Sequence, residues 1–195
     1  WTNYHLIFQE LTSNGPQLIF EDEKVLVTTI PLDHRIYTNG FLFREKPAER
    51  KLNMKAVANH KIDKAYFRNI KSGKDVILED GRTISNAELT FDPLEPKCYA
   101  YCSDTGYYPD IIPQIRNVDV LYHEATFLES DAKLSVKTKH ATAREAATIA
   151  NDSNVGTLIL GHYSTRYKSI ELFKEEAQSI FPNVELAEDG KFFEF

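Results

Sequence analysis

Histidine and acidic side chains follow four of the apolar runs in this sequence. Apolar runs of this length, rich in β-branched and aromatic residues, are typical of buried strands. Strand ends in α/β proteins collect ligands and catalytic groups, because a rigid sheet aims side chains from several strands at one crevice. Imidazoles and carboxylates there suit a divalent metal or acid–base chemistry. The runs are residues 25–30, 98–102, 118–122 and 157–160, and the groups that follow them are Asp33, His34, Asp104, His123, Glu124 and His162.

A further histidine, His140, precedes a predicted helix. Thr142 and Glu145 have the spacing of a capping box, which predicts a helix that begins at Ala143. A single histidine is more often a surface or core residue than a ligand. Several histidines and acids at one topological location favour a metal site or an acid–base site, and the residues alone leave both possibilities open.

The elements that must position these groups change character along the chain. Up to residue 45 the pattern predicts strands, and from Lys97 onward strands alternate with helices, which is typical of an α/β fold. Asp80 and Gly81 indicate a hairpin turn within residues 75–84. The early strands are expected at 6–8, 17–20, 24–29 and 40–44, and a late helix at 169–181.

Basic residues are concentrated in one part of an acidic chain. The net charge is −6, yet residues 44–74 contain ten basic and three acidic residues. A basic patch on an acidic body is expected of a localised contact with a polyanion, and a solvated lysine-rich surface is the alternative. The strand pattern is lost over 45–75, so we expect an inserted arm there. Its candidate binding residues are Arg50, Lys51, Lys55, Lys61, Lys64 and Arg68.

The two cysteines, Cys98 and Cys102, are expected to be free thiols. Positions i and i+4 on a strand lie roughly 13 Å apart, at about 3.3 Å per residue, whereas a disulfide needs Cα atoms within about 7 Å. Free thiols suit a reducing cytoplasm. No apolar stretch approaches the roughly 18 residues of a membrane span, so no membrane contact is expected.

Five sequence blocks carry a family resemblance, in order along the chain. They are P-L-D-H-R at 31–35, S-D-T at 103–105, H-E-A-T-F at 123–127, K-H-A-T at 139–142 and L-G-H-Y-S-T-R-Y at 160–167. In this order and spacing they resemble ribonuclease Z, the tRNA 3′-processing endonuclease family of the metallo-β-lactamase superfamily. The resemblance implies an α/β (α+β) fold, the αββα sandwich. Two sheets are expected, of which residues 1–195 supply roughly one and part of the other, with 45–75 as the family's flexible arm.

The resemblance also implies residue roles. His34, Asp104 and His162 correspond to zinc ligands, with Asp104 bridging two ions, and Mn²⁺ is an alternative to zinc. Glu124 corresponds to a carboxylate that orients His140, and His140 corresponds to the residue that protonates the leaving 3′ oxygen. His123, which precedes Glu124, is the third predicted catalytic residue. Ser164 and Arg166, which follow a ligand directly, are the candidate residues for binding the substrate phosphate, since the planar guanidinium suits phosphate.

The activity implied is zinc-dependent removal of the 3′ trailer from precursor tRNA by a cytoplasmic homodimer with two zinc ions per full-length subunit. The family's H-x-H-x-D-H motif is absent, and none of the six histidines has that spacing. We therefore expect the chain to represent the C-terminal part of the family's domain. The alternatives are a non-catalytic tRNA-binding fragment or subunit, and another phosphodiesterase of the same fold.

Overall fold

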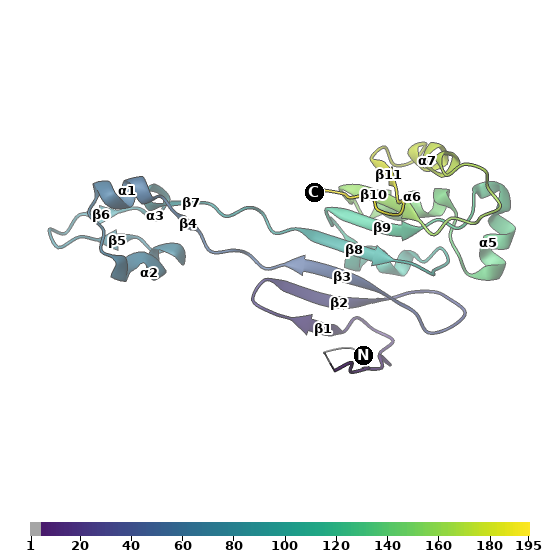
Figure 1. The fold of residues 1–195 in the computed structure, drawn as a ribbon, viewed down its shortest axis with the longest axis horizontal. Helices are drawn as coiled ribbons and strands as arrows, with labels where there is room; N and C mark the ends of the chain where they lie inside the picture. Colours follow the sequence, from purple (N-terminus) through teal and green to yellow (C-terminus); the bar gives the residue numbers. More distant parts are fainter. Residues whose placement is uncertain (1–4) are drawn as a thin grey trace. The chain divides into compact units, whose positions relative to one another are not determined.

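The computed structural model describes residues 5–195, which form two compact units. Unit 1 contains the residues up to Arg44 and from Lys97 onward, and unit 2 is Glu45–Pro96. The chain leaves unit 1 at the end of one strand and returns to it at the start of that strand's neighbour, as Figure 1 allows the reader to follow. Unit 2 is therefore an insertion between two paired strands.

Unit 1 is built on a single sheet of seven strands, in the order β1-β2-β3-β8-β9-β10-β11. The expectation that the domain has roughly one sheet and part of a second is wrong for the described residues of unit 1, whose strands all belong to one sheet. The reason is the antiparallel pairing of β3 with β8, which joins the early strands to the later ones. The strands are β1 (Leu18–Glu21), β2 (Val25–Pro31), β3 (Asn39–Glu45), β8 (Cys98–Cys102), β9 (Val120–Glu124), β10 (Thr157–Gly161) and β11 (Val184–Leu186).

Strand direction decides which loops meet. Strands β8, β9, β10 and β11 run parallel to one another, and β3 runs antiparallel to β8. Strand β2 is the sheet neighbour of β3, and residues 32–38 are too short for a crossover, so β2 is antiparallel to β3. Hence β2 runs in the same direction as β8. The carboxyl ends of β2, β8, β9 and β10 lie at one edge of the sheet.

Helices α6 (Ala143–Asp152) and α7 (Glu171–Gln178) pack together against the parallel strands. Ala146, Ala147 and Ala150 are fully buried, and their small side chains bring α6 close to the sheet. The capping box predicted at Thr142 is present and α6 begins at Ala143, as predicted. The remaining helical segments of unit 1 are η2 (Pro109–Ile111), α4 (Ile112–Ile115), η3 (Glu129–Asp131) and α5 (Ala132–Thr138).

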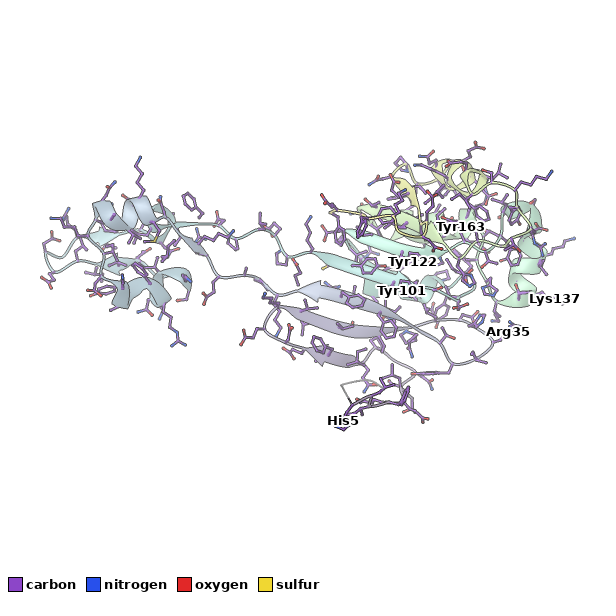
Figure 2. All side chains as sticks on the ribbon, viewed as in Figure 1. His5, Arg35, Tyr101, Tyr122, Lys137 and Tyr163 are labelled. Carbon is purple, nitrogen blue, oxygen red and sulfur yellow. The ribbon has the colours of Figure 1, made fainter. Side chains whose placement is uncertain are left out.

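The opposite face of the sheet presents tyrosines. Ala100 and Cys102 belong to the buried core, so the alternating side chains Tyr99 and Tyr101 point to the other face. Tyr101 stacks on Tyr122 of the neighbouring strand with ring centroids 4.7 Å apart, and Figure 2 labels both residues. The apolar core of unit 1 therefore lies on the side of α6 and α7.

Unit 2 has a core of its own, formed by Val57, Ile62, Ile70, Val76, Ile84 and Leu89. Three of these residues lie beyond position 75, so the arm expected at 45–75 is only the first part of the unit. The hairpin predicted around Asp80-Gly81 is present. The elements are β4 (Lys51–Leu52), α1 (Met54–Asn59), η1 (Lys64–Tyr66), α2 (Phe67–Lys71), β5 (Val76–Ile77), β6 (Thr83–Ile84), α3 (Asn86–Leu89) and β7 (Thr90–Phe91).

Other expectations have clear outcomes. The four apolar runs form β2, β8, β9 and β10, as predicted, and both cysteines are free. The strand expected at residues 6–8 is wrong, because this segment is exposed and pairs with no strand among the described residues. None of the helices described has the length and apolar character needed to cross a bilayer.

Candidate metal centre

Four candidate residues converge at the edge where the parallel strands end. Asp104 follows β8, Glu124 ends β9, His162 follows β10, and His140 lies in the loop before α6. One donor atom from each lies within 4.8 Å of the donors from the other three. The sheet thus brings together residues that are up to 58 positions apart in sequence. Carboxylate and imidazole donors in such a group suit a borderline divalent ion such as Zn²⁺.

Glu124 is the fully buried centre of this group. Its Oε1 accepts hydrogen bonds from the Thr105 backbone N–H and from His140 Nδ1, both at 2.7 Å. Its Oε2 accepts from the Thr126 hydroxyl at 2.6 Å, from the Thr126 N–H at 3.3 Å and from the Ala141 N–H at 3.2 Å. Five donors occupy the acceptor capacity of one carboxylate. Glu124 therefore orients its neighbours and is not a free ligand.

The Thr126 hydroxyl fixes the tautomer of His162. Its single proton goes to the Glu124 carboxylate, so at 2.8 Å it accepts a proton from His162 Nδ1. His162 Nε2 then carries a lone pair, and this atom lies 3.4 Å from Asp104 Oδ1. Two unprotonated donors facing each other are what a cation needs, so Asp104 and His162 fit a divalent metal.

Three imidazoles form a row beside this pair. The ring centroid of His140 lies 5.2 Å from that of His162 and 5.0 Å from that of His34. His34 Nδ1 lies 2.8 Å from the Lys139 carbonyl, which can only accept, so Nδ1 is protonated and Nε2 is free. His140 donates through Nδ1 to Glu124, so its Nε2 is the ring nitrogen that Glu124 does not engage. His34 lies outside the group of four and joins it through His140.

The backbone at the site is strained. Asp104 has φ = 57° and His162 has φ = 61°, and Lys139, just before His140, has φ = 60°. A residue other than glycine in this left-handed region costs about 1–3 kcal/mol and persists only when its surroundings hold it there. Here the hydrogen bonds around Glu124 supply that restraint. Positive φ at three residues beside one carboxylate indicates that the fold holds the candidate ligands in fixed positions.

His123 differs from the other predicted catalytic residues. Its side chain is fully buried, Nδ1 donates to the Glu124 carbonyl at 2.7 Å, and Nε2 has no partner among the described residues. Burial lowers the pKa of His123 below its ordinary value, so the ring is neutral. An enclosed imidazole cannot exchange a proton with a substrate, so we do not assign proton transfer to it.

Ser164 and Arg166 lie on the loop that follows β10. Arg166 Nε donates to Ser164 Oγ at 3.2 Å, and its guanidinium lies over the Phe127 ring, 5.2 Å from the centroid. A weaker contact of 3.6 Å joins its Nη1 to Asp131. These contacts hold an arginine whose side chain remains 44% exposed. It is available to an anionic ligand.

The predicted arm residues of unit 2 divide into two kinds. Arg50 is half-buried, donates from Nε to Thr90 Oγ1 at 2.7 Å and forms an ion pair with Asp92, so it ties β4 to the end of the unit. Unit 2 as a whole has ten basic and nine acidic residues, because the part after residue 74 is acidic. The basic character therefore belongs to the first part of the unit, where five predicted residues are exposed: Lys51, Lys55, Lys61, Lys64 and Arg68.

Sequence reasoning missed the residues that orient the candidate ligands. Thr105 and Thr126 both bond Glu124, and Lys139 bonds His34 through its carbonyl. Each is adjacent to, or two positions from, a predicted site residue. The available signal was that each also lies inside one of the blocks S-D-T, H-E-A-T-F and K-H-A-T, whereas the acceptor that each group uses is set by the fold.

Comparison with known proteins gives the family context. A family model described as "Beta-lactamase superfamily domain" matches residues 69–163. A curated "Ribonuclease Z" from Parabacteroides distasonis is 43% identical over 187 residues, which cover 96% of this chain and 62% of the relative. A "Ribonuclease Z" from Porphyromonas gingivalis strain W83 is 44% identical over 178 residues, covering 91% and 59%. The resemblance to ribonuclease Z is confirmed. This chain spans about three fifths of the length of these ribonuclease Z sequences.

Solved structures confirm the metallo-β-lactamase fold. The metallo-β-lactamase fold protein YhfI from Bacillus subtilis has a TM-score of 0.58 at 17% identity, covering 94% of this chain and 54% of that one. A long form RNase Z from yeast has a TM-score of 0.54 at 20% identity, covering 85% and 17%. At these identities the likeness concerns the fold alone.

Proposed function

We propose that this chain carries the proton-donating and phosphate-binding part of a ribonuclease Z-like endonuclease that removes the 3′ trailer from precursor tRNA. One observation carries the proposal: a buried carboxylate orients an imidazole beside a pair of metal-compatible donors. Glu124 and His140 form the first pair, and Asp104 and His162 form the second. The 40–44% identity to proteins named "Ribonuclease Z" supports the choice of substrate.

The metal proposed is zinc, with Mn²⁺ as an alternative. Asp104 and His162 would hold it, and His34 would contribute from the end of β2, because its Nε2 is the unprotonated nitrogen. When bound, a pair of such ions activates water and offsets the negative charge that develops on the phosphate. The second ion needs donors beyond these three residues.

His140 is the proposed general acid. As water adds to phosphorus and the bond from phosphorus to the 3′ oxygen breaks, His140 Nε2 gives its proton to that oxygen. The products are a tRNA 3′-hydroxyl and a 5′-phosphorylated trailer. The buried Glu124 carboxylate keeps Nδ1 protonated and stabilises the positive imidazolium that donates the proton. The His140 side chain is only 13% exposed, which limits competing proton exchange with water.

Arg166 is the proposed phosphate-binding residue, with Ser164 holding its Nε. The exposed cations of unit 2 are proposed to contact the tRNA backbone, since lysine and arginine contacts to phosphate supply sequence-independent affinity. A homodimer and a cytoplasmic location are part of the same proposal, on the family resemblance.

The test is cleavage of a precursor tRNA with a short 3′ trailer in the presence of Zn²⁺, with both product ends mapped. We expect H140Q to lower kcat by about a hundredfold or more, because general acid catalysis contributes roughly 10²–10⁴. D104N should abolish cleavage and weaken zinc binding. The matched control is H5A, since His5 is exposed and distant in sequence from the site. Equal activity of H140Q and H5A would contradict the proposal.

A second function, tRNA binding without cleavage, is favoured by the exposed cations in the first part of unit 2. A non-catalytic tRNA-binding protein would bind precursor tRNA with a steep salt dependence and without sensitivity to a chelator. Binding without cleavage, unchanged by EDTA and by D104N, would establish that function instead. Cleavage of a small chromogenic phosphodiester without any activity on tRNA would indicate another phosphodiesterase.

A further inference from the structure

An ion pair that no proposed step uses lies beside the row of imidazoles. Lys139 Nζ lies 2.6 Å and 2.8 Å from the two carboxylate oxygens of Asp33. Both side chains are partly exposed, at 45% and 36%. They line a cavity of about 230 Å³ together with His140. The pair is thus outside the apolar core, and changing it leaves no packing void.

Lys139 is linked to both neighbouring histidines through its backbone. Its carbonyl accepts the proton of His34 Nδ1 at 2.8 Å, and the next residue in the chain is His140. Asp33 precedes His34 in the loop after β2, and Lys139 precedes His140 in the loop before α6. The ion pair therefore joins these two loops.

The same pair reaches the loop that carries Asp104. The Asp33 N–H donates to Thr105 Oγ1 at 3.2 Å, and the Gly106 N–H donates to the Asp33 carbonyl at 2.8 Å. Three loops that carry candidate ligands or the candidate acid are thus joined at Asp33 and Lys139.

Neither stability nor helix capping accounts for a lysine at this position. An exposed ion pair contributes about 0–1 kcal/mol. Lys139 ends α5 in the left-handed conformation, donating its N–H to the Ser135 carbonyl, where asparagine or glycine is the better residue. A lysine in this left-handed position is therefore less favourable than asparagine or glycine, and the contact of its side chain with Asp33 must offset that cost.

We infer that Asp33 and Lys139 are positioning residues that set the orientation of His34 and its separation from His140. With the ion pair in place, the Lys139 carbonyl points at His34 Nδ1 and leaves Nε2 as the only nitrogen that can bind a metal. Without it, the 139–142 loop is free to turn its first carbonyl away, and His34 becomes a mixture of tautomers. The inference rests on the proposed function for its catalytic consequence, while the tautomer consequence stands independently.

The test compares K139N, K139R and D33N with the control K137N. Asparagine tolerates the left-handed conformation but cannot reach Asp33, whereas arginine can. Lys137 is an exposed lysine on α5, labelled in Figure 2. The first measurement is the tautomer of His34 by long-range ¹H–¹⁵N correlation on ¹⁵N-histidine protein without metal. We expect the Nδ1–H tautomer in the unchanged protein, K139R and K137N, and a mixture in K139N and D33N.

Two further measurements separate positioning from stability. We expect K139N to lose about tenfold to a hundredfold in affinity for Co²⁺, followed by its visible absorption, as is usual for groups that orient a metal ligand. On precursor tRNA, kcat should fall while KM changes little, and K139R should recover most of both losses. The melting temperature of K139N should match that of K137N.

The outcomes are distinct. A pure Nδ1–H tautomer in K139N, or Co²⁺ affinity equal to that of the unchanged protein, overturns the inference. A lower melting temperature in K139N, together with a K139R variant that does not recover Co²⁺ affinity and kcat, also overturns the inference in favour of a structural role. If the tautomer shifts but no form of the protein cleaves tRNA, the positioning role stands and the proposed function fails.

Discussion

At the scale of the residue, one buried carboxylate organises the candidate site. Glu124 receives five hydrogen bonds; it orients His140 directly and, through Thr126, fixes the tautomer of His162. A buried charge is costly unless its hydrogen bonds are complete. Removing one of these donors should therefore disturb the geometry of the site without changing a candidate metal ligand.

Removing the Thr126 hydroxyl is the sharpest test of this relay. T126V keeps the side-chain shape but leaves Glu124 Oε2 and His162 Nδ1 without their shared partner. We expect the free energy of unfolding to fall by about 1.5–3 kcal/mol, the usual contribution of a hydrogen bond to a charged group. Zinc affinity, measured by competition with a chromogenic chelator, should also fall. T126S retains a hydroxyl and should restore zinc affinity; if it fails to do so, the hydroxyl is not the relay.

His123 predicts a pH dependence of stability. Burial lowers its pKa in the folded protein below the ordinary value of 6.5. Between those two pKa values the unfolded chain binds more protons than the folded chain, so the free energy of unfolding rises with pH across that window. Above 6.5 this residue has no further effect. Urea unfolding at several pH values should show a smaller slope in H123F than in H5A; equal slopes would contradict the prediction.

At the scale of the element, local sequence signals predicted the features that depend only on residues close together in sequence. Four apolar runs became strands, and the Thr142–Glu145 spacing became a capping box at the start of α6. The segment 6–8 has the same apolar character but no pairing strand, and pairing is a property of distant sequence. The positive φ at Asp104 and His162 was equally out of reach, because it depends on tertiary hydrogen bonds beside these residues, from the Thr105 N–H to Glu124 and between His162 Nδ1 and Thr126.

The capping box also restrains the candidate acid, because α6 begins three residues after His140. Thr142 Oγ1 accepts from the Glu145 N–H at 3.1 Å, and the Glu145 carboxylate accepts from the Thr142 N–H at 2.8 Å. We expect T142A to lower the free energy of unfolding by about 1 kcal/mol, within the usual range for loss of such a cap. T142S should be near neutral. Chemical denaturation measures both, and equal stabilities of T142A and T142S would show that the hydroxyl does not cap α6.

At the scale of the whole molecule, unit 2 is a separable insertion. It has its own core, and the strands that flank it are antiparallel neighbours in which Arg44 pairs directly with Cys98. The two ends of the gap are therefore as close as the ends of a hairpin. A deletion confined to 46–72 would remove Val57, Ile62 and Ile70 and leave the rest of their core exposed. The structure indicates that residues 45–96 are the correct unit to remove.

Replacing 45–96 by Asn-Gly should leave unit 1 folded, because with Lys97 it forms a three-residue hairpin loop between the paired residues Arg44 and Cys98. On the proposed function, hydrolysis of a small chromogenic phosphodiester should stay within about threefold, since none of the candidate metal-binding or proton-donating residues lies in unit 2. Cleavage of precursor tRNA should fall by roughly a hundredfold or more, because the exposed cations of unit 2 supply phosphate contacts. A full-length variant with Lys51, Lys55 and Lys61 changed to glutamine controls for folding, and its tRNA affinity should depend less steeply on salt. Equal loss of both activities in the deletion would mean that unit 2 supports the site itself and does not serve as a tRNA contact.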